Sequence, residues 1–171
     1  MKKIVLTGAA GRLGSYLREP LSKLAETLVS TDLAPDIGEL YESETYVAAD
    51  LASYDDMFAI IAGADMVVHF GAIGDEAPFD QILGPNIIGV YNVWEAAHHH
   101  GVRRVVYASS IHAVGMHSRT DFIGTDAEHR PDSYYGLAKC FAEDLARMYW
   151  EKRGLEAVCM RLYSVTRPNG T

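Results

Sequence analysis

Cysteine is scarce in this sequence, and long apolar runs are missing from it. Only Cys140 and Cys159 occur among 171 residues, which excludes a disulfide framework. Both lie in apolar periodic segments, so we expect reduced packing residues and a cytoplasmic protein. No apolar run approaches the length of a membrane helix, and Gly8 interrupts the start too soon for a signal peptide. We therefore expect no membrane partner.

The chain also has few positively charged residues and few histidines or cysteines at spacings typical of metal ligands. The chain has 15 Lys and Arg against 23 Asp and Glu, a net charge of −8. This balance should repel nucleic acid, so we expect no nucleic-acid partner. The run His98–His100 ends a predicted helix and is interpreted as a solvated terminus. No other histidines or cysteines show convincing ligand spacing, so no metal is predicted.

Apolar residues are plentiful and periodic, at 49% of the chain. Strand and helix patterns alternate throughout, which predicts an α/β protein with a doubly wound parallel sheet and helices on both faces. We expect one domain over 1–171. The predicted strands are 4–7, 27–31, 45–49, 65–70, 102–109 and 156–162. The predicted helices are 12–25, 54–62, 78–100 and 133–153, with loops at 33–44 and 115–132.

Three glycines follow the first predicted strand. They stand three apart in the stretch from Thr7 to Gly14, at Gly8, Gly11 and Gly14, and a helix pattern follows. Such a turn presents backbone N–H groups at a helix N-terminus, where the partial positive charge suits a pyrophosphate. The common dinucleotide fingerprint is G-x-G-x-x-G, so this wider spacing leaves a tight structural turn as the alternative.

An acidic residue follows at the end of the second predicted strand. Asp32 stands about 20 positions past the glycines, where a carboxylate can bind both ribose hydroxyls of an adenosine. Its charge would repel a 2′-phosphate, so Asp32 predicts NAD rather than NADP. The alternative interpretation is a solvated loop aspartate.

A serine, a tyrosine and a lysine form the candidate catalytic group. Ser110 follows the apolar fifth strand, and Tyr135 and Lys139 share one helix face at i and i+4. A tyrosine is a poor base, with a pKa near 10, and a nearby ammonium is expected to lower that pKa. Taken alone, the Tyr–Lys pair is more often structural, and a serine at a strand end is as often part of a turn. The hypothesis depends on their occurrence together with the glycine turn.

These residues resemble the extended short-chain dehydrogenase/reductases, the NAD-dependent epimerase/dehydratase family, over the whole chain. The resemblance implies a Rossmann-type sheet of strand order 3-2-1-4-5-6 and a Ser110–Tyr135–Lys139 catalytic triad. It implies NAD as the cofactor, and Tyr135 and Lys139 would also contact it. The other positions that match the family's cofactor site are Gly8, Gly11, Arg12, Leu13, Gly14, Asp32, Asp50, Leu51, Phe70, Gly71, Ala72 and Asn86.

Within the family, the chain is most similar to the uronate dehydrogenases. The similar stretches are 78–92, 130–132, 135–141 and 145–149. The resemblance implies oxidation of the C1 hydroxyl of a hexuronate or related sugar to its lactone, with Tyr135 taking the hydroxyl proton. The substrate positions it implies are Gly74, Ser110, Ile111, His112 and Tyr135.

Three departures from that group bear on the substrate. Ile111 stands where an asparagine is typical, and Gly74 where a serine is typical. The family normally continues past position 171 with a smaller lobe that closes over the sugar. Arg167 is the only nearby candidate for an arginine that binds the substrate carboxylate. We therefore expect a complete cofactor half and an incomplete substrate half.

Two other functions stay open. A nucleotide-sugar epimerase would need the C-terminal lobe for its nucleotide. A cofactor-sensing or scaffold protein would use a dead dehydrogenase domain, yet Tyr135 and Lys139 are both present. In the family, helices such as 78–100 and 133–153 pair across a symmetric interface, so a homodimer or higher homo-oligomer is expected.

Overall fold

The computed structural model describes residues 1–163 and contains one parallel six-stranded sheet. Its order, β3-β2-β1-β4-β5-β6, is the predicted one, and all five neighbouring pairs are parallel. The strands are β1 (Lys3–Thr7), β2 (Thr27–Asp32), β3 (Glu44–Ala48), β4 (Met66–His69), β5 (Arg104–Ser110) and β6 (Glu156–Leu162). Arg167 lies outside the described residues.

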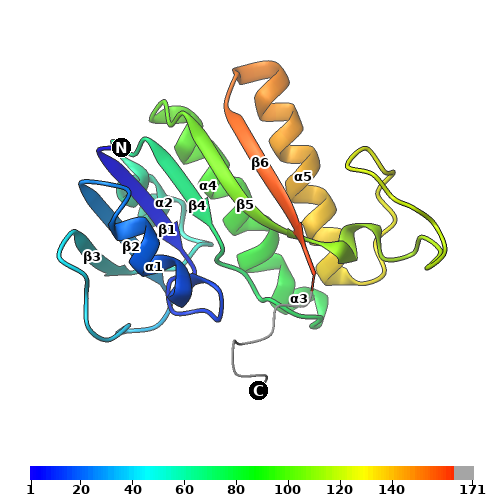
Figure 1. The fold of residues 1–171 in the computed structure, drawn as a ribbon, viewed down its shortest axis with the longest axis horizontal. Coiled ribbons are helices and arrows are strands. Elements are labelled where there is room, and N and C mark those ends of the chain that lie inside the picture. The colour runs from blue at the N-terminus through cyan, green and yellow to red at the C-terminus, as the bar shows by residue number, and fades with distance from the viewer. Residues whose placement is uncertain (164–171) are drawn as a thin grey trace.

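Helices cover both faces of this sheet (Figure 1). Helix α1 (Gly14–Ser22) covers one face, where Leu21 packs with Ile4, Leu6 and Leu28. The other face carries α2 (Tyr54–Ile61), α4 (Gly89–His99) and α5 (Tyr134–Arg153). Their buried side chains form the larger core around Trp94. Among residues 1–163, no helix combines the length and apolarity needed to cross a membrane.

The predicted single helix over 78–100 is interrupted. It consists of α3 (Phe79–Ile82), a π-helix (Leu83–Ile88) and α4. The cause is visible in the sequence at Pro85, which has no N–H to donate one turn back. The helix accommodates it with a wider turn, as π-bulges do at functional sites. Asn86, on this wide turn, is fully buried.

Other boundaries differ from the prediction by a few residues. The first helix, predicted over 12–25, begins at Gly14 and ends at Ser22, because residues before Gly14 belong to the glycine turn. The fifth strand starts two residues later than predicted and ends one later, at Ser110. A short 3₁₀ helix (Ile111–Val114), capped by the Ser110 side chain, was not predicted. Both cysteines are free, as expected, with Cys140 buried.

Candidate active site

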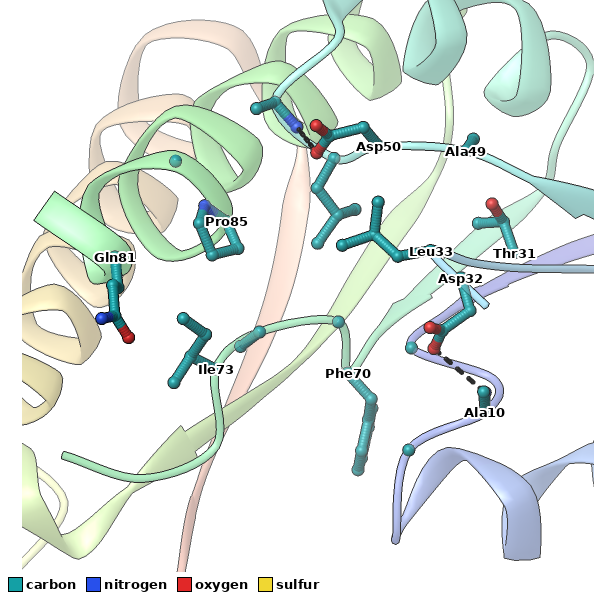
Figure 2. A pocket seen from close by; sticks show the side chains of 17 residues that line it. Ala10, Thr31, Asp32, Leu33, Ala49, Asp50, Phe70, Ile73, Gln81 and Pro85 are labelled. Atoms are coloured by element: carbon teal, nitrogen blue, oxygen red, sulfur yellow. Dashed lines mark hydrogen bonds between the residues drawn. The ribbon is translucent and has the colours of Figure 1, made fainter. Parts of the chain in front are cut away.

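A pocket of about 510 Å³ lies at the carboxyl ends of the first four strands. Ligands of open α/β sheets bind at this edge, and the volume lies within the usual range for ligand pockets. Figure 2 shows Asp32 and Leu33 on one side of it and Ile73, Gln81 and Pro85 on the other. The lining residues are Gly8, Ala10, Gly11, Thr31, Asp32, Leu33, Ala49, Asp50, Leu51, Ala52, Phe70, Gly71, Ala72, Ile73, Gln81, Gly84 and Pro85.

The glycine turn forms the pocket wall beyond β1. Gly8 has φ +76°, and a Cβ there would lie 2.5 Å from the backbone nitrogen of Gly71. A Cβ on Gly14 would lie 1.9 Å from the carbonyl oxygen of Gly8. Within the described chain, no side chain caps α1, although the backbone N–H groups of Ser15 and Tyr16 donate to the carbonyls of Gly11 and Leu13. The partial positive charge at this end of the helix still suits an anion. Glycine is therefore required here by close backbone approach.

Asp32 holds the glycine turn from the end of β2. Its Oδ2 accepts a hydrogen bond from the Ala10 backbone N–H at 3.0 Å, a contact drawn in Figure 2. Its Oδ1 accepts one from the Ala34 N–H at 3.3 Å. A carboxylate offers about four acceptor positions, so these two contacts leave capacity for a ligand hydroxyl.

Not every predicted cofactor residue lines the pocket. Arg12, Leu13 and Gly14 lie just past the lining residues, on the approach to α1. Asn86 stands behind the pocket, because its Oδ1 accepts from Ile73 N at 2.8 Å and its Nδ2 donates to Ile73 O at 3.0 Å. The structure thus assigns Asn86 a direct contact with the loop after β4, a role that its position in the sequence did not reveal.

The three predicted catalytic residues lie together at the end of β5 and the start of α5, and none of them lines the pocket. Ser110 ends β5, where its Oγ accepts a hydrogen bond from the His112 backbone N–H at 3.3 Å, and the same hydroxyl acts on the phenol of Tyr135 on α5. Lys139 lies one turn further along α5, with its Nζ 5.1 Å from the centre of the Tyr135 ring. The Lys139 Nζ donates to the Ala108 carbonyl at 2.7 Å and is almost fully buried. The i, i+4 spacing therefore places both side chains next to Ser110.

The electrostatics of this group differ from the prediction in one respect. The pKa of Tyr135 is raised rather than lowered, mainly by burial, although the neighbouring Ser110 hydroxyl acts in the opposite direction. Burial also lowers the pKa of Lys139 to about 7. Sequence spacing could not show this, because Lys139 is directed to the Ala108 carbonyl and is itself desolvated.

One of the other predicted substrate positions is in contact with Tyr135. The His112 ring packs edge-on against the Tyr135 ring at 5.7 Å between centroids. Its Nδ1 lies 2.9 Å from Asp132, a contact that sequence reasoning missed. Ile111 is half-buried, whereas Gly74 is exposed, and a Cβ added to Gly74 would meet nothing within 4 Å. A serine at Gly74 would therefore fit without a clash.

A second polar group that the sequence analysis missed supports the ends of β5 and β6. Glu143, one turn beyond Lys139 on α5, accepts from Ser109 Oγ at 2.5 Å and from Arg161 Nη2 at 2.7 Å. Burial raises the pKa of Glu143, but these hydrogen bonds outweigh it and keep the pKa below its ordinary value. The sequence signal for this role is that Glu143 lies four residues after Lys139, on the same face of α5.

A buried histidine beneath the pocket wall makes the stability of the fold depend on pH. His69 Nδ1 is hydrogen bonded to Thr7 Oγ1 at 2.6 Å, and that oxygen also accepts from Gly71 N. Burial, together with the charge of Lys139, lowers the pKa of His69 from 6.5 to about 3. The unfolded chain therefore takes up a proton at pH values where the folded chain does not.

We expect the free energy of unfolding to fall as the pH drops from 6.5 towards 3. The contribution of His69 is fully present above pH 6.5 and decreases by up to about 1.4 kcal/mol per pH unit. Urea unfolding between pH 7 and 4.5 measures the slope. In the His69→Phe variant, the free energy of unfolding should change less steeply with pH over this range. An equal slope in both proteins would exclude His69 as the source of the pH dependence.

The comparisons with known proteins agree with this geometry. Residues 4–170 match the family described as the NAD dependent epimerase/dehydratase family. The chain belongs to this family. It is 47% identical to the uronate dehydrogenase of Agrobacterium fabrum over 170 residues, 99% of this chain and 64% of that protein. It is 43% identical to that of Pseudomonas putida over 162 residues, 95% of this chain and 60% of that one.

Solved structures of family members have the same fold. The crystal structure of uronate dehydrogenase from Agrobacterium tumefaciens matches 97% of this chain with a TM-score of 0.93, at 47% identity. This chain covers 62% of that structure. A variant of the same enzyme, in complex with NAD, matches with a TM-score of 0.88, over 92% of this chain and 59% of that one. The chain thus spans about three-fifths of the length of these relatives.

Proposed function

We propose that this chain binds NAD and takes part in oxidising the C1 hydroxyl of a hexuronate or related sugar to its lactone. The observation that carries the proposal is that Ser110, Tyr135 and Lys139 meet at the carboxyl end of β5, the strand next to β4, and that the loop after β4 lines the pocket. Identity above 40% to two uronate dehydrogenases supports the choice of substrate class.

The residues present fit a dinucleotide. Gly8 and Gly14 lie so close to neighbouring backbone that a side chain at either position would clash. The start of α1, which no side chain caps among the described residues, suits a diphosphate. Asp32 and Asp50 lie at the pocket end where the adenosine would bind. When bound, NAD would supply the hydride acceptor and a positively charged ring.

Tyr135 would remove the proton from the substrate hydroxyl. Burial alone makes its phenolate costly, so neighbouring groups must favour the charged form. The Ser110 hydroxyl does so already, and a positive charge beside the ring would lower the pKa further. Ser110 would hold the substrate oxygen, and Lys139 would bind a ribose hydroxyl from its place behind the ring.

Two helices offer a surface for a second copy of this chain. Exposed apolar side chains lie on α4 and α5, among them Tyr91, Leu137 and Met148. These helices lie on the same face of the sheet (Figure 1), and we propose that they pair symmetrically in a homodimer. Analytical ultracentrifugation should give twice the monomer mass, and a monomer at micromolar concentration would contradict the proposal.

A screen for NADH formation tests the function. The 171-residue chain is incubated with NAD and either hexuronates, aldoses or nucleotide sugars, and absorbance of NADH is followed. We expect the fastest turnover with a hexuronate. Turnover with nucleotide sugars alone would favour the epimerase alternative. Tight NAD binding without turnover on any sugar would favour a cofactor-sensing protein instead.

Asp32→Ala should relax the preference for NAD over NADP. The substitution removes hydrogen bonds to the ribose and repulsion of a 2′-phosphate, and we expect the ratio of the two Kd values to fall about tenfold. Calorimetric titration with each nucleotide measures the ratio. Asp36→Ala is the matched control, because its carboxylate contacts only the Gly38 N–H of the same loop among the described residues. Unchanged selectivity in Asp32→Ala would contradict its assigned role.

A further inference from the structure

Glu76, in the loop after β4, contacts the start of α5. We propose that Glu76 is a positioning residue that fixes Tyr135 relative to the pocket. The proposal rests on the proposed function, in which Tyr135 is the base. It concerns a carboxylate that acts through the backbone of Tyr135 and does not itself touch the substrate.

The contact is bidentate and involves the catalytic residue directly. Glu76 Oε2 accepts from the backbone N–H of Tyr135 at 2.9 Å, and Oε1 accepts from that of Tyr134 at 3.2 Å. The carboxylate therefore satisfies two of the unpaired N–H groups at the helix start and faces the positive end of the helix dipole. Hydrogen bonds to an ionised acceptor are about twice as strong as neutral ones.

No other group in the described chain serves this purpose for Tyr135. The first turn of α5 carries no acidic side chain of its own within residues 1–163. Ser133 Oγ caps the helix at Gly136 N, at 2.9 Å, one position further on. The N–H of Tyr135 is thus bonded to a residue 59 positions earlier in the chain. The start of α5 is therefore held by the loop after β4 as well as by its own cap.

The other end of the same loop is fixed at the pocket. Ile73 lines the pocket, and both its backbone polar atoms pair with the buried Asn86 side chain. Figure 2 shows Ile73 on the same side of the pocket as Gln81 and Pro85. Glu76 lies three positions after Ile73, which limits the distance between their Cα atoms to about 11 Å. The segment from Ile73 to Glu76 is therefore a short strap between the pocket and Tyr135.

This arrangement determines where the phenol lies relative to a bound dinucleotide. The strap has Asn86 at one end and the Tyr135 backbone at the other, so loss of the second contact loosens the first residues of α5 and leaves the pocket wall in place. Reactions that depend on orientation are sensitive to displacements of about 1 Å, which can lower the rate by about 100-fold. The expected consequence is a loss of turnover with unchanged cofactor affinity.

Amide hydrogen exchange of the 171-residue chain, followed by NMR, tests the contact without any need for activity. Glu76→Ala should speed exchange at the Tyr134 and Tyr135 amides about tenfold. Glu76→Gln keeps one acceptor oxygen and should give a smaller increase. Asp55→Asn, which removes a carboxylate from the first turn of α2, is the matched control and should leave both amides unchanged. Unchanged exchange in Glu76→Ala would overturn the proposal.

Steady-state kinetics on a sugar that the unaltered chain oxidises test the consequence. Glu76→Ala should lower kcat and kcat/KM by the same factor, between about 10- and 100-fold, with the Kd for NAD unchanged. Faster exchange at Tyr135 with unchanged kcat would overturn the positioning role. If the unaltered chain oxidises no sugar, the proposed function fails, while the exchange result still decides whether Glu76 holds α5.

Discussion

Tyr135→Phe will lower kcat by about 10²- to 10⁴-fold and leave the Kd for NAD nearly unchanged. This range is what a positioned acid–base group contributes. Phenylalanine keeps the ring that packs against His112 and lies beside Lys139. Only the hydroxyl whose pKa Ser110 lowers is removed. Turnover of the sugar identified by the screen, together with a calorimetric NAD titration, measures both quantities.

The neighbouring tyrosine provides the control for this experiment. Tyr134 precedes Tyr135 on α5 but is half-exposed, and its ring packs against Phe79. Tyr134→Phe removes a hydroxyl from the same helix turn and should leave kcat unchanged. If Tyr135→Phe retained the activity of the unaltered chain, the assignment of the base would be wrong.

Gly8→Ala will abolish NAD binding and destabilise the fold by about 3 kcal/mol or more. Two effects combine: a left-handed backbone costs about 1–2 kcal/mol for an L residue, and the added Cβ would lie 2.5 Å from Gly71 N. Overpacking of this kind adds about 1–3 kcal/mol. The end of β1 and the loop after β4 would have to move apart. Because both line the pocket, two of its walls would also be displaced. Urea unfolding and NAD titration measure the two losses.

Gly38→Ala separates the two effects. Gly38 has nearly the same backbone conformation, with φ +78°, but an added Cβ there meets nothing within 4 Å. We expect a cost of about 1–2 kcal/mol and normal NAD binding. Equal losses in Gly8→Ala and Gly38→Ala would show that close approach of the Gly8 backbone to Gly71 is not what the site requires.

Most of the fold could be predicted because its determinants are local and periodic. The buried run Ile4–Leu6, ending in the glycine turn, fixes both the first strand and the start of the site. The alternation of strands with helices determines a parallel sheet, and its predicted order is confirmed. The interruption at Pro85 is visible in the sequence, but the long apolar pattern around it favours a single helix.

The parts of the site that could not be predicted depend on contacts between distant segments. Glu76 meets the Tyr135 backbone across 59 positions, and Asp132 meets His112 across 20. Neither pair has a local pattern that would identify it. The pKa of Tyr135 also depends on burial, which spacing on a helix does not determine. The sequence therefore identifies the candidate base, whereas its electrostatic environment and its support required the structure.

We propose that the glycine turn and Tyr135 contact the same bound dinucleotide. A crystal structure of the 171-residue chain soaked with NAD tests it most directly. We predict the diphosphate against Gly8 and Gly11, the adenosine ribose at Asp32, and the nicotinamide beside the Tyr135 hydroxyl. A dinucleotide bound elsewhere, or one whose nicotinamide lies away from Tyr135, would contradict the claim.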